Sequence, residues 1–124
     1  MRLSEFELDV LTHFWQDGEL SAPELFERLG DDRGVTYSTV KTIVDRLEQK
    51  GAIERIDSRG RTIVYAAAIK QEKIRKPLVK TFLRRLFGND LRPLFVQLLR
   101  DEKLSAEELD YLQRLIEETR KSGK

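Results

Sequence analysis

Apolar residues recur every three to four positions through the first fifty residues, which is the spacing of helices with one buried face. This spacing and the residues that flank it predict three helices: one between Ser4 and Gly18, a short one between Ser21 and Gly30, and one from Thr36 to about Lys50. The first two starts carry a capping box, Ser followed three residues later by Glu, and a glycine is expected to end each helix. Residues 31–35 are expected to form a polar loop.

After Gly51 the hydrophobic period changes from 3.6 residues to two, the spacing of strands. Residues 52–56 and 62–66 alternate in this way. The segment between them, Asp57-Ser58-Arg59-Gly60-Arg61, is typical of a turn because it combines glycine with polar residues. The sequence therefore predicts a β-hairpin with two arginines at its tip.

From Lys70 onward the pattern is helical again and predicts three more helices. The first is broken by Gly88-Asn89-Asp90, the second is a short apolar helix from about Leu91, and the third begins with a capping box at Ser105. Residues 119–124 form a polar tail that we expect to fray.

The apolar stripes of these last helices are too extensive for an isolated three-helix tail to bury. Large apolar patches that stay on a surface usually mark interfaces. We therefore expect a symmetric dimer that forms through residues 72–120. The residues expected in the interface are Ile74, Leu78, Phe82, Leu86, Leu94, Leu98, Leu109, Leu112 and Ile116.

Three helices followed by a two-stranded hairpin is the element order of a winged helix-turn-helix. The predicted fold class is mainly α: a winged helix-turn-helix over residues 1–69, with the hairpin as its wing, followed by a three-helix dimerisation region over residues 70–124. In such folds the third helix enters the major groove of DNA.

The polar side chains of the third predicted helix suit contact with DNA. Hydroxyl and lysine groups at the start of such a helix can hydrogen-bond base edges or phosphate oxygens, and an arginine one turn later would reach the flanking backbone. The candidates are Tyr37, Ser38, Thr39, Lys41, Thr42 and Arg46, with Arg59 and Arg61 at the hairpin tip. Each feature has a plainer explanation, since Ser and Thr cap helices and turn arginines are commonly just solvated. Their combination with the element order favours DNA binding.

The formal net charge of +1 conceals an uneven distribution. Residues 1–69 carry nine Lys/Arg and thirteen Asp/Glu (−4), residues 70–124 carry fourteen and nine (+5), and residues 33–61 carry seven and four (+3). A local basic face matters more than the total, so the chain is compatible with nucleic-acid binding. The basic segment 70–85 is either a solvated helix face or a supplementary phosphate contact.

The composition excludes several kinds of chemistry. With no cysteine and one histidine, His13, the chain cannot form a disulfide, a thiolate metal site or a site of several histidines. We therefore expect no metal, no cofactor and no enzymatic activity. The longest apolar runs are too short to span a bilayer, and the first residues do not resemble a signal peptide. The expected location is the cytoplasm, without insertion into a membrane.

Several stretches together resemble the BlaI/MecI/CopY family of bacterial repressors, often called penicillinase repressors. The resemblance covers about residues 3–120. It rests on Leu3-Ser4-Glu5 with Trp15, Thr36-Tyr37-Ser38-Thr39-Val40-Lys41-Thr42 continuing to Asp45-Arg46-Leu47, Lys50-Gly51, Val64-Tyr65, Leu86-Phe87-Gly88 and Leu104-Ser105-Ala106-Glu107-Glu108-Leu109.

The resemblance implies a homodimeric transcriptional repressor that binds an inverted-repeat operator in double-stranded DNA. By position it implies DNA contacts from Tyr37, Thr39, Lys41, Thr42 and Arg46, and from Arg59, Arg61 and Tyr65 of the wing.

The resemblance also implies ways in which repression could end. The copper-responsive branch uses a cysteine-rich motif, which this chain lacks. In the β-lactam branch a membrane sensor-protease, directly or through a downstream protease, leads to cleavage of an Asn-Phe bond in the C-terminal region. The matching pair here is Gln97-Leu98, which differs chemically, so cleavage between them stays a hypothesis.

Three other functions fit parts of the pattern. A winged helix can act as a protein-interaction module, although a protein-binding groove would more often be apolar where residues 37–42 are polar. An RNA-binding protein would need exposed aromatics for stacking, and the candidate stretch offers only Tyr37 and Tyr65. An enzyme would need a nucleophile, a base and oxyanion donors, for which the sequence offers almost nothing.

Overall fold

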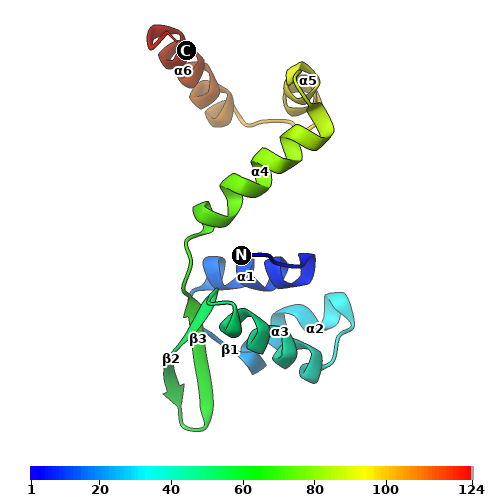
Figure 1. Ribbon diagram of the computed structural model, residues 1–124, viewed down its shortest axis with the longest axis vertical. Helices are drawn as coiled ribbons and strands as arrows, with labels where there is room; N and C mark the ends of the chain where they lie inside the picture. Colours follow the sequence, from blue (N-terminus) through cyan, green and yellow to red (C-terminus); the bar gives the residue numbers. More distant parts are fainter. Residues whose placement is uncertain (124) are drawn as a thin grey trace. The chain divides into compact units, whose positions relative to one another are not determined.

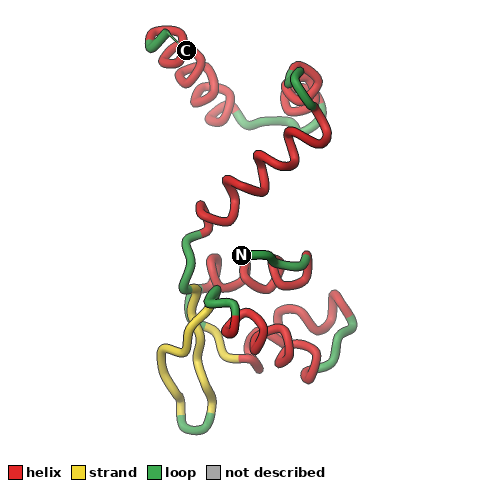
Figure 2. Tube along the Cα trace, viewed as in Figure 1, coloured by secondary structure: helices red, strands yellow, loops and turns green. Residues whose placement is uncertain are grey.

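The computed structural model describes residues 1–123, without the side chains of residues 30–33 and of Arg59 (Figure 1). By its internal contacts the chain forms two compact units, Met1–Pro77 and Leu78–Lys124. The helices and strands are α1 (Glu5–Asp17), β1 (Leu20–Ser21), α2 (Ala22–Arg33), α3 (Tyr37–Gln49), β2 (Ile53–Arg59), β3 (Thr62–Ala67), α4 (Gln71–Phe87), α5 (Arg92–Arg100) and α6 (Ala106–Lys121). The predicted fold class, three helices and a hairpin followed by three helices, is confirmed (Figure 2).

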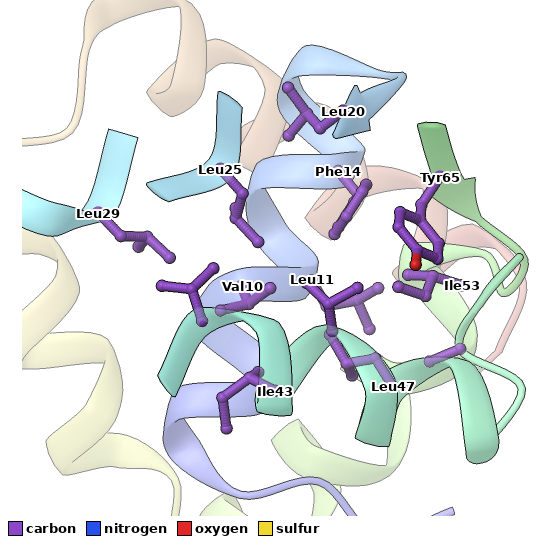
Figure 3. Packing of buried hydrophobic residues seen from close by; sticks show 13 residues of the cluster. Val10, Leu11, Phe14, Leu20, Leu25, Leu29, Ile43, Leu47, Ile53 and Tyr65 are labelled. Carbon is purple, nitrogen blue, oxygen red and sulfur yellow. The ribbon is translucent and has the colours of Figure 1, made fainter. Parts of the chain in front are cut away.

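The N-terminal unit is built around one apolar core to which α1, α2, α3 and the strands all contribute (Figure 3). Because each helix buries one stripe, the side chains converge between the three helices and the sheet. The core residues are Val10, Leu11, Phe14, Leu20, Leu25, Leu29, Val40, Ile43, Val44, Leu47, Ala52, Ile53 and Tyr65.

The local signals at the helix starts act as predicted. The Ser4 backbone N–H donates to Glu7 Oε1 at 2.9 Å, and the Glu7 N–H donates to Ser4 Oγ at 3.1 Å. The same reciprocal pair joins Ser21 to Glu24 at the start of α2. These side chains satisfy backbone donors that a helix start leaves without intrahelical partners.

The expected end of α2 is wrong. The helix continues through Gly30 to Arg33, so three residues assigned to a polar loop are helical. The left-handed conformation that ends a helix belongs instead to Gly34, whose φ is +61°. A glycine within a helix weakens it without ending it, and the next glycine supplies the stop.

The sheet is larger than the predicted hairpin. Its strand order is β1-β3-β2, and β1 pairs antiparallel with β3 through Leu20↔Tyr65 and Ser21↔Val64. The hairpin strands also extend further toward the turn than expected, because β2 continues to Arg59. Pairing shifts register between Arg55 and Asp57, which leaves Ile56 in a bulge with 38% of its surface exposed.

The C-terminal unit leaves its large apolar side chains accessible. The described residues of α5, α6 and α4 beyond Pro77 include no buried side chain, and Leu86, Phe82 and Leu99 are 65%, 50% and 50% exposed. The predicted capping box at Ser105 opens α6. α6 stays helical through Lys121, with Ser122 as its C-cap, and fraying of the tail from residue 119 stays a prediction.

Candidate nucleic-acid interface

α3 buries its apolar side and exposes its polar side. Val40, Val44 and Leu47 have essentially no exposed surface, and Ile43 is 6% exposed. The opposite side carries the predicted polar residues, of which Lys41 is half-buried and the others are exposed, namely Tyr37, Ser38, Thr39, Thr42, Asp45, Arg46 and Gln49. The structure thus brings the candidate residues of this helix to one accessible face.

The hydroxyl groups at the start of α3 have both a capping role and an exposed position. Thr36 is the N-cap, and its Oγ1 accepts from the Thr39 backbone N–H at 3.2 Å. Its hydroxyl also lies 3.0 Å from those of Ser38 and Thr39. The Thr42 hydroxyl donates to the Ser38 carbonyl at 2.9 Å. Thr36 supplies the cap, so the hydroxyls of Ser38, Thr39 and Thr42 are not needed for it. These three residues lie on the surface, where a ligand can reach their oxygens.

The Lys41 side chain lies on the side of α3 that faces β3. Its Nζ is 3.3 Å from Asp45 Oδ1 and 5.9 Å from the centre of the Tyr65 ring. Partial burial lowers the pKa of Lys41, but the hydrogen bond to Asp45 raises it, and the net pKa is above its ordinary value. Lys41 is therefore a fixed positive charge at neutral pH.

Tyr65 was expected on the DNA-binding surface, and the structure places it in the core instead (Figure 3). Only 1% of its surface is exposed, because its side chain packs into the apolar core from β3, the central strand, where Tyr65 pairs with Leu20 and with Arg55. The hydroxyl is buried and has no hydrogen-bond partner among the described residues. Tyr65 supports Lys41 from the core side and is not a surface contact.

The hairpin places Arg61 on the surface next to its glycine. Gly60 has a φ of +66°, and the Ser58 hydroxyl donates to its carbonyl at 2.8 Å, which fixes the turn. Arg61 is exposed, whereas the side chain of Arg59 lies outside the described part of the chain. Arg55 of β2 donates to Glu48 of α3 at 2.7 Å, so an ion pair joins the hairpin to the helix.

A small pocket of about 160 Å³ opens where α2, α3 and β3 meet. We call it the α2–α3–β3 pocket. Its lining consists of Ala22, Pro23, Tyr37, Lys41, Arg61, Thr62, Ile63 and Tyr65. The sequence pattern did not indicate this pocket, because its walls come from three elements that are distant along the chain.

The far end of α3 is fixed by an ion pair that the sequence analysis also missed. Lys50, the C-cap, donates to Glu7 Oε1 at 2.8 Å and to the Arg2 carbonyl at 2.8 Å. The Glu7 side chain is 4% exposed. Burial raises its pKa, but the bonds from Lys50 and Ser4 lower it more, so the net pKa lies below its ordinary value of 4.5.

Glu7→Gln is expected to destabilise the N-terminal unit by roughly 1–3 kcal/mol at neutral pH, because the Lys50 ammonium loses its buried counter-charge. A lowered carboxyl pKa contributes stability above about 4.5, and that stability is lost as the pH falls through the folded-state pKa. The variant should therefore show a weaker loss of stability on acidification. Urea unfolding between pH 7 and pH 3 measures both effects.

Asp90→Asn is the matched control, because Asp90 also has a lowered pKa, through hydrogen bonds from Arg92, but lies on the surface. This control should change stability little. Equal acid dependence in Glu7→Gln and the unmodified chain would contradict the assigned role of Glu7.

The structure also tests where the expected dimerisation residues lie. Ile74, in the first turns of α4, is partly buried against the core of the N-terminal unit, and its assignment to a dimer interface stays a prediction. The apolar residues of α4 repeat every four positions on both sides of the boundary after Pro77, because this one helix belongs to both compact units. Gln97 and Leu98 lie within α5, and Leu98 is 36% exposed.

Two further observations concern the described residues only. They contain no group of three or more acidic or histidine side chains placed to hold a metal ion. None of their helices has the length and hydrophobicity needed to cross a membrane.

A three-helix core, a small antiparallel sheet and an exposed polar third helix define a winged-helix protein. The chain belongs to the penicillinase repressor family, because the model of that family matches residues 3–118. This confirms the predicted family and, with it, the prediction that the chain is not an enzyme, since the family comprises DNA-binding transcriptional repressors.

Relatives and a solved structure are similar to this chain over most of their lengths. The penicillinase repressor of Staphylococcus aureus is 28% identical over 121 residues, covering 98% of this chain and 95% of that protein. The penicillinase repressor of Bacillus licheniformis is 26% identical over 117 residues, covering 94% and 91%. The DNA-binding domain of the repressor BlaI has a TM-score of 0.52 and 27% identity, covering 56% of this chain and 84% of that domain.

Proposed function

We propose that this chain represses transcription by binding an inverted-repeat operator as a homodimer, with α3 in the major groove and the β2–β3 hairpin as the wing. The observation that carries the proposal is the exposed polar face of α3, which begins at a capped helix start and adjoins the arginine-bearing hairpin. Helix N-termini and hydroxyl side chains suit both base edges and phosphates. The proposed contacts are Tyr37, Ser38, Thr39, Lys41, Thr42 and Arg46 of α3, with Arg59 and Arg61 of the hairpin.

The proposed dimer forms through the helices that follow Pro77. Leu78, Phe82 and Leu86 recur every four residues on α4 and are 50%, 50% and 65% exposed, and exposed apolar side chains also lie on α5 and α6. Monomeric proteins rarely expose so many large apolar groups together. A second copy would cover them through a self-complementary interface. The other proposed interface residues are Leu94, Leu98, Leu109, Leu112 and Ile116.

Cleavage between Gln97 and Leu98 is the proposed route by which repression ends. A cut there would interrupt α5 and separate α6 from the rest of the chain. It would remove proposed interface residues while leaving the DNA-binding unit intact. A membrane sensor-protease or its downstream protease is the proposed agent.

Selection of DNA from a random pool tests the function directly. The expected product is a palindrome, because a two-fold symmetric dimer binds two symmetry-related half-sites. Enrichment of a non-palindromic sequence would contradict the dimeric mode, and failure to retain any duplex DNA would contradict the function itself.

Arg46→Ala is expected to weaken binding to operator and to scrambled DNA by about the same factor, because Arg46 lies in the last turn of α3, one turn beyond Thr42, and would contact the flanking backbone. Each lost phosphate contact lowers the salt dependence of binding by about one unit, so the dimer, which loses one contact per half-site, should lose about two. Titrations at several salt concentrations measure this change, with Arg120→Ala in the last turn of α6 as the matched control. Weakened binding to the operator alone would assign Arg46 to a base instead.

A further inference from the structure

We propose that the α2–α3–β3 pocket holds one phosphate of the DNA backbone, and that Lys41 and Arg61 bind this same phosphate. The inference rests on the proposed DNA-binding function and makes it more specific. It assigns Lys41 to the backbone, whereas its position in the helix alone would allow contact with either a base edge or a phosphate.

The charge of the pocket fits an anion. Its lining includes the cations Lys41 and Arg61 and the hydroxyl of Thr62, and none of its lining residues carries a carboxylate. Residues 1–69 as a whole have a net charge of −4, so this cationic pocket is not one part of a generally basic surface. Two cations that converge from a helix and a hairpin would attract a phosphate locally.

The direction of Lys41 fits a phosphate better than a base edge. Its side chain lines the pocket together with four residues of the hairpin region, Arg61 to Ile63 and Tyr65, and is 40% exposed. The ammonium therefore lies on the side of α3 that faces the hairpin. The exposed ion pair with Asp45 is 3.3 Å long and easily exchanged for a phosphate oxygen.

The walls and the size of the pocket fit one phosphate and its sugar. A volume of about 160 Å³ is enough for a tetrahedral anion. Ala22, Pro23 and Ile63 provide apolar surface against which a deoxyribose can pack.

The buried hydroxyl of Tyr65 gives independent support. Tyr65 forms part of the pocket wall, and its Oη is buried without a hydrogen-bond partner among the described residues. A buried hydroxyl without a partner is unfavourable. A water molecule ordered between this hydroxyl and the bound phosphate would supply the missing acceptor when DNA binds.

The test compares the salt dependence of DNA binding in three variants: Lys41→Ala, Arg61→Ala and the double variant. Neutralising one phosphate contributes about 0.9 to the slope of log affinity against log salt. Because the dimer carries the pocket once per half-site, the double variant should lose about two units in total if both cations bind one phosphate. Two separate phosphates per half-site would give a loss of about four units and would overturn the proposal.

Two further measurements make the result decisive. Each variant should weaken operator and scrambled duplex by the same factor, and Lys121→Ala at the end of α6 is the matched control. In the selected operator, replacing phosphates one at a time by uncharged methylphosphonates should identify one position per half-site that weakens the unmodified chain but leaves the double variant unaffected.

The possible failures are distinguishable. If Lys41→Ala weakens the operator but not scrambled DNA, Lys41 contacts a base and the pocket assignment is wrong, while the proposed function stands. The same conclusion follows if no methylphosphonate position is coupled to the double variant. If the unmodified chain binds no duplex at all, the proposed function itself is wrong.

Discussion

A chain that ends at Gln97 is expected to bind the operator at least about 100-fold more weakly than the full chain, while its winged helix stays folded. The buried apolar core lies entirely between Val10 and Tyr65, so the truncation removes none of it. The proposed dimer interface, in contrast, loses the last third of α5 and all of α6. In a dimer the second half-site is bound intramolecularly, which typically increases affinity by about 10²–10⁴.

Circular dichroism of residues 1–97 measures folding, sedimentation measures self-association and a gel shift measures operator affinity. Fusing a parallel two-stranded coiled coil after Gln97 is the matched control. It restores a dimer without restoring α6, and should recover much of the lost affinity. Near-full affinity in a folded monomer would show that dimerisation does not control binding, and regulation would then act on the winged helix itself.

The elements that the sequence predicted well are those with strong local signals. Ser4 with Glu7, Ser21 with Glu24 and Ser105 with Glu108 each form the expected capping box, because partners three residues apart meet in any helix. The change of period after Gly51 located the hairpin for the same reason. These features depend on neighbours in the chain and are independent of the tertiary fold.

The features that escaped the sequence analysis are set by contacts between distant segments. β1 has two residues, Leu20–Ser21, and such a short strand shows no alternation that could reveal it. Its pairing with β3 makes β3 a central strand, and the Tyr65 side chain on that strand packs into the core formed by distant segments. The bulge at Ile56 depends on the register of β2 against β3, which a period cannot specify.

The same distinction applies to the candidate site: the features set by local spacing were predictable, and those set by contacts between distant residues were not. The polar face of α3 follows from its apolar stripe, because residues that are not buried in such a helix must face outward. The ion pair of Glu7 with Lys50 joins residues 43 positions apart, and the α2–α3–β3 pocket joins three elements. Periodicity cannot predict either. The contact of Ile74 with the N-terminal core also escaped the pattern, because the single helix α4 belongs to both compact units.

Leu11→Ala is expected to reduce the free energy of unfolding by roughly 2–5 kcal/mol. Leu11 has no exposed surface and lies where side chains of α1 and α3 converge with the sheet (Figure 3). Truncation there leaves a cavity that a well-packed core cannot fill. Because small domains are stable by only about 5–15 kcal/mol, the variant should unfold at a markedly lower urea concentration.

Leu86→Ala is the matched control, because it removes the same atoms from a side chain that is 65% exposed. It should leave the urea midpoint of the N-terminal unit almost unchanged and should instead weaken self-association, if α4 forms the proposed interface. Unfolding must be followed at several protein concentrations, since dimerisation makes apparent stability depend on concentration. An equal loss of intrinsic stability in both variants would mean that Leu11 carries no more of the core than a surface leucine does.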